Sequence, residues 1–102
     1  MNTRHTLNYV AQMFEVDPTR IVQPNRGRQS VAQARDVYFY ILHKEGKSHH
    51  EIAEIGERAR TSVTHSIIRT KKALEKDDYL NERVQRLLHI VRNTKIKEPS
   101  QV

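Results

Sequence analysis

The residues best suited to chemistry in this chain are cations and small hydroxyl residues gathered on one predicted helix. Arg60, Thr61 and Ser62 stand where that helix begins, and Arg69 and Lys72 follow along it. A guanidinium forms two parallel hydrogen bonds with a suitable acceptor pair, and a hydroxyl both donates and accepts. Free amide groups at a helix N-terminus add further donors for an anion. This combination of residue types predicts a surface that binds a polyanion.

The net charge of the chain is concentrated in its middle. Of the 102 residues, 18 are Lys or Arg and 12 are Asp or Glu, which gives a formal charge of +6. Eleven of these basic residues and five of the acidic ones lie between residues 20 and 72, and the remainder cancel. The windows 20–35 and 58–72 contain no acidic residue. Such a surface favours a nucleic acid as partner, with an acidic protein as the alternative.

Other chemistries find little support in the sequence. The six His residues form no i,i+4 pair and the chain has no Cys, so we expect no metal site. No phosphate-binding Gly-x-x-x-x-Gly-Lys-Ser/Thr motif and no readable Ser/His/Asp arrangement occur, which predicts no nucleotide, no cofactor and no enzyme. No run approaches the roughly 20 apolar residues of a membrane span, and the N-terminus has no apolar signal region. We therefore expect a cytoplasmic domain that does not contact membranes.

Hydrophobic spacing predicts an all-α bundle of five to six helices and no strand. We expect a first helix over residues 6–16, a short turn opened by Asp17-Pro18, and a long helix capped by Ser30 and ended by Gly46. Three more helices complete the expected bundle, over 49–56 with a Ser48–Glu51 capping box and an exit at Gly56, over about 60–76, and over 79–92. Residues 1–94 then form one domain, and residues 95–102 a flexible tail.

The segment 48–68 has the spacing of a helix-turn-helix. The small residue Ala53 is followed by a turn at Gly56-Glu57, and Val63 begins the apolar side of the second helix. At about 100° per residue, the opposite side of that helix displays Thr61, His65, Ile68, Arg69 and Lys72. Of these, we expect Ile68 to pack under the last helix. A helix that carries such residues at its N-terminus reads the major groove of duplex DNA, and the narrow major groove of A-form RNA suits it less well.

Taken together, these segments resemble the C-terminal DNA-binding domain, domain IV, of the bacterial chromosomal replication initiator DnaA, over about residues 6–92. The resemblance rests on four stretches, namely Val10-Ala11 with Val16-Asp17, the loop 25–29 ahead of Ser30–Arg35, Glu51-Ile52 ahead of 56–65, and the ending 72–77. The stretch 56–65 is similar to the family signature GGRDHTTVLHA. Ala59 and Arg60 depart from that signature where the family has Asp and His, and Asp36 replaces a Gln.

The resemblance implies a Trp-repressor-like helix-turn-helix fold that binds double-stranded DNA and regulates replication or transcription. The helix over 60–76 would read the major groove, and the basic loop 24–29 would enter the adjacent minor groove. By strict register the minor-groove arginine of the family falls on Gly27, so Arg26 or Arg28 must take its place. The residues expected to contact DNA are Arg26, Arg28, Arg35, Ser48, Arg58, Arg60, Thr61, Ser62, His65, Arg69 and Lys72.

Overall fold

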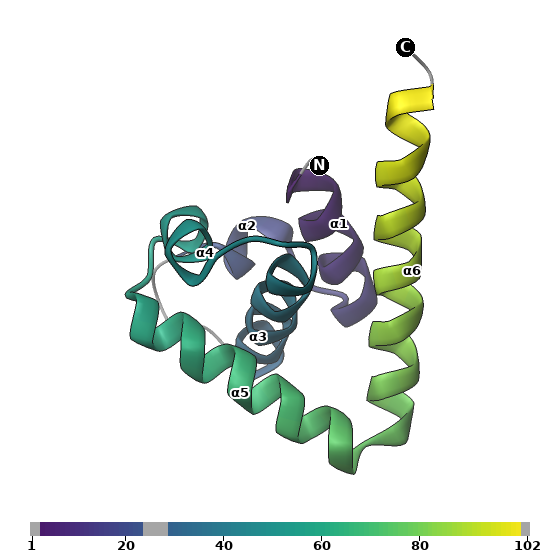
Figure 1. Ribbon diagram of the computed structural model, residues 1–102. Helices are drawn as coiled ribbons and strands as arrows, with labels where there is room; N and C mark the ends of the chain where they lie inside the picture. Colours follow the sequence, from purple (N-terminus) through teal and green to yellow (C-terminus); the bar gives the residue numbers. More distant parts are fainter. Residues whose placement is uncertain (1–2, 24–28, 101–102) are drawn as a thin grey trace.

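The computed structural model describes residues 3–23 and 29–100, which fold into a bundle of helices (Figure 1). The helices are α1 (Thr3–Phe14), α2 (Pro18–Ile21), α3 (Gln29–Lys44), α4 (His49–Gly56), α5 (Arg60–Lys76) and α6 (Asp78–Ser100). These described residues contain no strand, so the prediction of an all-α bundle is confirmed. None of their helices combines the length and the apolar character that a membrane crossing demands.

α3 is the central helix of the bundle, and α1, α2, α4 and α5 all pack against it. Residues 37–42 are an unbroken buried run, so α3 is apolar around its whole circumference there. Three consecutive aromatic residues belong to this run. Burial raises the pKa of one of them, Tyr38, to about 12, and the hydrogen bond from its hydroxyl to the Thr3 carbonyl opposes that rise.

Three of the helices end in the same way, with one residue in the left-handed conformation. These residues are Glu15, Gly46 and Glu57, with φ of 55°, 102° and 52°. The amide of the following residue then donates to a carbonyl five positions earlier, in the pairs Val16–Ala11 at 3.0 Å, Lys47–Leu42 at 3.1 Å and Arg58–Ala53 at 2.9 Å. This Schellman geometry satisfies the last carbonyls and turns the chain sharply. It also ends the first helix at Phe14, earlier than the predicted 6–16 span.

Gly56 is needed for packing, whereas the sequence predicted it only as the exit of the helix over 49–56. The left-handed residue is Glu57, and Gly56 is the last residue of α4. A Cβ atom built on Gly56 would lie 2.6 Å from Cζ of Phe39 on α3, closer than any side chain tolerates. The missing side chain therefore lets the end of α4 approach α3, and this approach places the turn that leads into α5.

The predicted capping box at the start of α4 is present. The Ser48 hydroxyl accepts the Glu51 amide at 3.1 Å, and the Glu51 carboxylate accepts the Ser48 amide at 2.9 Å. These hydrogen bonds hold the pKa of Glu51 below its usual value. The start of α3 differs slightly from the prediction, because the helix already includes Gln29 and so takes in Ser30.

α6 is longer than the sequence suggested. It runs to Ser100, so the predicted tail from residue 95 is helical over nearly all of its length. Polar composition does not by itself end a helix, and no glycine interrupts this stretch. Arg92 binds Glu45 at 3.2 Å and Arg83 donates to the Met13 carbonyl at 2.9 Å, which fasten α6 to the bundle. Its C-terminal end projects beyond the other helices (Figure 1).

Candidate nucleic-acid interface

α4 and α5 form the predicted helix-turn-helix, and both pack on α3. Ala53 on α4 and Val63 on α5 are buried, with 7% and 0% of their surfaces exposed. Because a helix turns by about 100° per residue, burial of Val63, Ile67 and Leu74 directs the other side of α5 outward. We call this side the outer face of α5, and its residues are Thr61, His65, Ile68 and Lys72, all of them exposed.

The N-terminus of α5 presents donors without a side-chain cap. Ala59 is the N-cap residue, with extended backbone, and it makes no capping side-chain hydrogen bond because alanine has no acceptor. The first-turn amides of an α-helix have no partner within the helix. Arg60, Thr61 and Ser62 occupy this first turn, and all three are exposed. Backbone donors, a guanidinium and two hydroxyls are thus all exposed in the first turn, at the positive end of the helix dipole.

A hollow of about 330 Å³ opens beside this helix start. Its lining residues are His49, Arg60, Thr61, Thr64 and His65, so α4 contributes one wall and α5 the other. The Thr64 hydroxyl lies 3.0 Å from the Arg60 carbonyl, to which it donates, and 2.8 Å from Nδ1 of His49. His49 must therefore donate from Nδ1, which leaves Nε2 as an acceptor when the ring is neutral. The hollow offers donors and acceptors at one place.

Arg35 lies in the interior, which contradicts the expectation that it contacts DNA. Only 7% of the residue is exposed. Its guanidinium donates to the carbonyls of Ile21 at 2.6 Å, Arg20 at 3.0 Å and Gln23 at 3.1 Å. Burial lowers the pKa of Arg35 most, and the positive charge of Arg58 lowers it further. The physical reason for the burial is that the carbonyls ending α2 need donors that α3 supplies.

Arg58 binds one of the three carbonyls that Arg35 binds. Its guanidinium donates to the Gln23 carbonyl at 2.6 Å, so Arg35 and Arg58 share one acceptor. Gln23 is the last described residue before the basic loop, and Arg58 stands immediately ahead of the turn into α5. The start of the loop is therefore fixed next to the start of α5. Arg26 and Arg28, the loop arginines predicted to bind DNA, lie outside the described residues.

Arg69 forms an ion pair that the sequence did not reveal. Its Nε and one Nη bind the two carboxylate oxygens of Asp36, each at 3.0 Å, and the same Nη donates to Ser66 at 3.2 Å. The Asp36 hydrogen bond raises the pKa of Arg69. The side chain of Arg69 is still 61% exposed. The pairing thus neutralises in part the charge of Arg69, which was predicted to contact DNA, and also that of Asp36.

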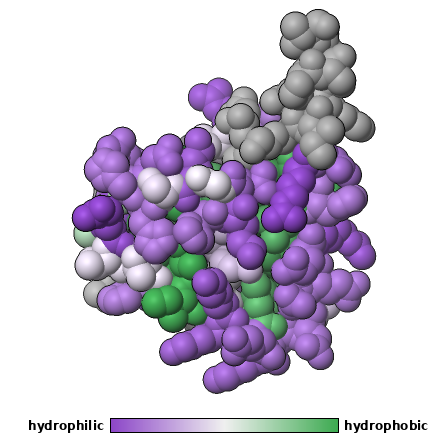
Figure 2. All heavy atoms as spheres, in the orientation of Figure 1, coloured by the Kyte–Doolittle hydropathy of each residue, from purple (hydrophilic) through white to green (hydrophobic). Residues whose placement is uncertain are grey.

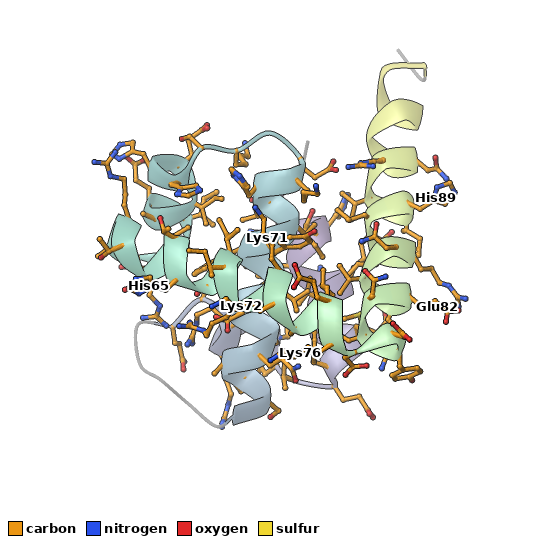
Figure 3. All side chains as sticks on the ribbon, turned by 60° about the horizontal axis from the view of Figure 1, so that its bottom comes forward. His65, Lys71, Lys72, Lys76, Glu82 and His89 are labelled. Atoms are coloured by element: carbon orange, nitrogen blue, oxygen red, sulfur yellow. The ribbon has the colours of Figure 1, made fainter. Side chains whose placement is uncertain are left out.

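The lysines of α5 divide between two sides of the helix. Figure 3 shows His65, Lys72 and Lys76 following one another along α5, and Lys71 on its other edge. Lys72 belongs to the outer face, two turns beyond His65, as the spacing predicted. Ser48, also predicted to contact DNA, is exposed at the start of α4, where its hydroxyl already accepts a capping hydrogen bond.

Ile68 is exposed, and the prediction that it packs under the last helix is wrong. It retains 43% of its surface, whereas the neighbouring Ile67 retains 3%. α6 packs against α5 and α1, but the outer face points away from the core that these helices share. Figure 2 shows hydrophobic residues near the middle of α5 within a mainly hydrophilic surface.

Sequence reasoning missed two residues of the hollow, His49 and Thr64. A threonine in a helix often donates its hydroxyl to the carbonyl four residues earlier, as Thr64 does to Arg60. This tendency is the one sequence signal that could have placed Thr64 beside Arg60. His49 comes from another helix, so only the tertiary structure brings it close. The described residues hold no group of three His, Cys, Asp or Glu side chains placed to bind a metal ion.

Replacing Arg35 tests its interior role. We expect Arg35→Met to lower the free energy of unfolding by about 1–3 kcal/mol, because the carbonyls of Arg20, Ile21 and Gln23 each lose one donor. Arg69→Met is the matched control, and removal of its exposed ion pair should cost no more than about 1 kcal/mol. Urea unfolding followed by circular dichroism measures both. Equal small losses would show that the Arg35 contacts do not stabilise the fold.

Comparison with known protein families matches residues 4–69 to the family described as bacterial dnaA protein helix-turn-helix. The match covers well over half of the 102 residues and takes in α4, the turn and α5 as far as Arg69. Lys72 and α6 lie beyond it. No curated protein matches the chain. The buried crossing of α4 and α5, the exposed first turn of α5 and this match agree, and the chain belongs to the bacterial DnaA helix-turn-helix family, which is a family of DNA-binding domains.

Proposed function

We propose that this domain binds double-stranded DNA sequence-specifically and acts on the nucleoid in the regulation of replication or transcription. In this proposal α5 lies in the major groove, and the basic loop 24–29 enters the adjacent minor groove. The proposal rests above all on the N-terminus of α5. There an uncapped helix end presents Arg60, Thr61 and Ser62 to solvent, on a helix whose other side is anchored in the core.

The first turn of α5 would read base edges. Arg60 has the length and the paired donors that match O6 and N7 of guanine. Thr61 brings a methyl group for thymine and a hydroxyl, and Ser62 brings a second hydroxyl that can reach a base or a phosphate. His65 follows one turn later on the outer face and would reach a phosphate or a base edge. The free amides of the helix end suit a phosphate.

Phosphate contacts would hold the domain in register. Lys72 is exposed at the far end of the outer face, and Ser48 is exposed at the start of α4. Arg69 would reach a phosphate with the Nη group that Asp36 does not bind. Arg35 and Arg58 would act as positioning residues, because both guanidinium groups already bind the Gln23 carbonyl.

The loop would reach the minor groove because its start is held beside α5. A helix-turn-helix with an attached basic arm spans two neighbouring grooves in this way. An arginine is favoured in a narrow minor groove by the enhanced negative potential there. Arg26 and Arg28 are the candidates for that contact.

Salt dependence tests duplex binding. With about six phosphate contacts, log K should fall against log salt concentration with a slope of about −5. Fluorescence anisotropy with a duplex selected by the domain from a random library measures this slope. Absence of binding to any duplex at low salt would contradict the proposal, and would favour an acidic protein as the partner of the basic surface.

Arg60 and Lys72 should differ in the kind of affinity that they supply. We expect Arg60→Ala to cost about 1–3 kcal/mol on the selected duplex and less on unrelated duplexes, because a base contact is lost. Lys72→Ala, a control on the same face, should weaken binding to all duplexes alike. An equal loss on both kinds of duplex for Arg60→Ala would make Arg60 a phosphate contact.

The loop is tested by replacing both of its arginines. Arg26→Ala combined with Arg28→Ala should weaken duplex binding, and the loss should be greatest where the flanking minor groove is narrow and rich in A·T pairs. Competition titrations with duplexes that differ only in that flank measure the effect. If affinity is unchanged on every duplex, the loop does not enter the groove.

A further inference from the structure

One apolar side chain interrupts the polar outer face of α5. Three large hydrophobic residues are exposed in the described part of the chain, namely Ile68 at 43%, Tyr79 at 69% and Ile90 at 37%. The guanidinium carbon of Arg83 lies 5.3 Å from the centre of the Tyr79 ring, over its face. Ile90 lines a hollow between α1 and α6. Ile68 instead stands on the face that we propose for DNA.

The position of Ile68 along α5 suits the floor of the groove. Thr61, Ile68 and Lys72 follow the helical repeat, so their side chains lie on one side of the helix. From Thr61 to Ile68 the helix rises by about 10 Å, which is within the width of the major groove, about 12 Å. A helix that inserts its first turn therefore also brings its second and third turns within reach of base edges.

The chemistry of the groove limits what an isoleucine can contact there. The major-groove edges of the bases carry hydrogen-bond donors and acceptors, and one apolar group, the C5-methyl of thymine. Isoleucine has no polar atom with which to satisfy a donor or acceptor. Its contact with polar edges would leave them desolvated and unpaired, at a cost in affinity. Contact with a methyl group instead removes apolar surface of both partners from water.

From this juxtaposition we propose that Ile68 is a specificity-determining residue that recognises a thymine C5-methyl in the major groove. The inference rests on the proposed function, since it assigns one more base contact to the same face. His65 lies one turn before Ile68 and Lys72 one turn after it, and both are exposed. Polar or cationic contacts on either side would hold the aliphatic side chain against the base between them.

The experiment removes the methyl group from the DNA and the side chain from the protein separately. Each thymine of the selected duplex is replaced in turn by deoxyuridine, which lacks only the methyl group, and affinities are measured by anisotropy. At one position the unaltered domain should lose about fourfold in affinity, the equivalent of about 0.8 kcal/mol for one buried methyl-sized group. Ile68→Ala should lose a similar factor in affinity for the unmodified duplex. On the duplex with deoxyuridine at that one position, Ile68→Ala should bind as well as the unaltered domain does.

Matched controls separate this contact from general effects. Ile90→Ala removes an exposed isoleucine of α6 and should leave both affinities unchanged. Arg60→Ala should bind more weakly yet keep its sensitivity to deoxyuridine. Circular dichroism of Ile68→Ala checks that the exposed substitution leaves the fold intact.

Three results would overturn the inference. The first is an unaltered domain that is insensitive to deoxyuridine at every position, and the second is an Ile68→Ala variant that keeps full sensitivity. The third is an equal loss by Ile68→Ala on thymine and uracil duplexes, which would assign Ile68 to the sugar–phosphate backbone. Failure to bind any duplex at low salt would instead reject the proposed function itself, so the two failures are distinguishable.

Discussion

The buried guanidinium of Arg35 is the contact on which the arrangement of the binding surface depends. It bonds to three carbonyls of the segment that ends α2, and it thereby ties that segment to the central helix α3. Arg58 reaches the last of these carbonyls from the turn before α5. Two cations close together would repel each other, but the shared acceptor and Asp36 nearby offset that repulsion. Because of this arrangement, the basic loop begins beside the helix-turn-helix.

The arginines of the basic windows therefore have different tasks although their chemistry is the same. Arg35 and Arg58 bind backbone carbonyls of the chain itself, and Arg69 shares its charge with Asp36. Arg60 is exposed at the uncapped start of α5. The arginines differ in this way because the carbonyls at a helix end have no partner within the helix. Those that turn away from water must find donors nearby. An external anion is then left with the cations that keep donors directed to solvent.

Much of the fold could be predicted because its signals are local. The 3–4 spacing of Val63, Ile67, Thr70 and Leu74 located α5 and its buried side, and the pattern Ser48-x-x-Glu51 located the start of α4. Predictions that depended on contacts between helices were less accurate. Gly56 was predicted only as the exit of the helix over 49–56, but its role follows from the closeness of Phe39. Ile68 was assigned to the core by its hydrophobicity alone, although its position in the helical repeat already placed it on the outer face.

The sequence by itself determined the helix-turn-helix, the outward row of α5 and the concentration of positive charge around them. These properties follow from the periodicity of apolar residues and from the local composition. Both can be found in a short stretch of the sequence, without knowledge of the contacts between helices. Only the tertiary structure decided which arginine is buried, which is paired and which is open to a ligand. The reason is physical: the carbonyl partners of Arg35 and the carboxylate partner of Arg69 lie 12 to 33 residues away along the chain, and no local pattern encodes such distant contacts.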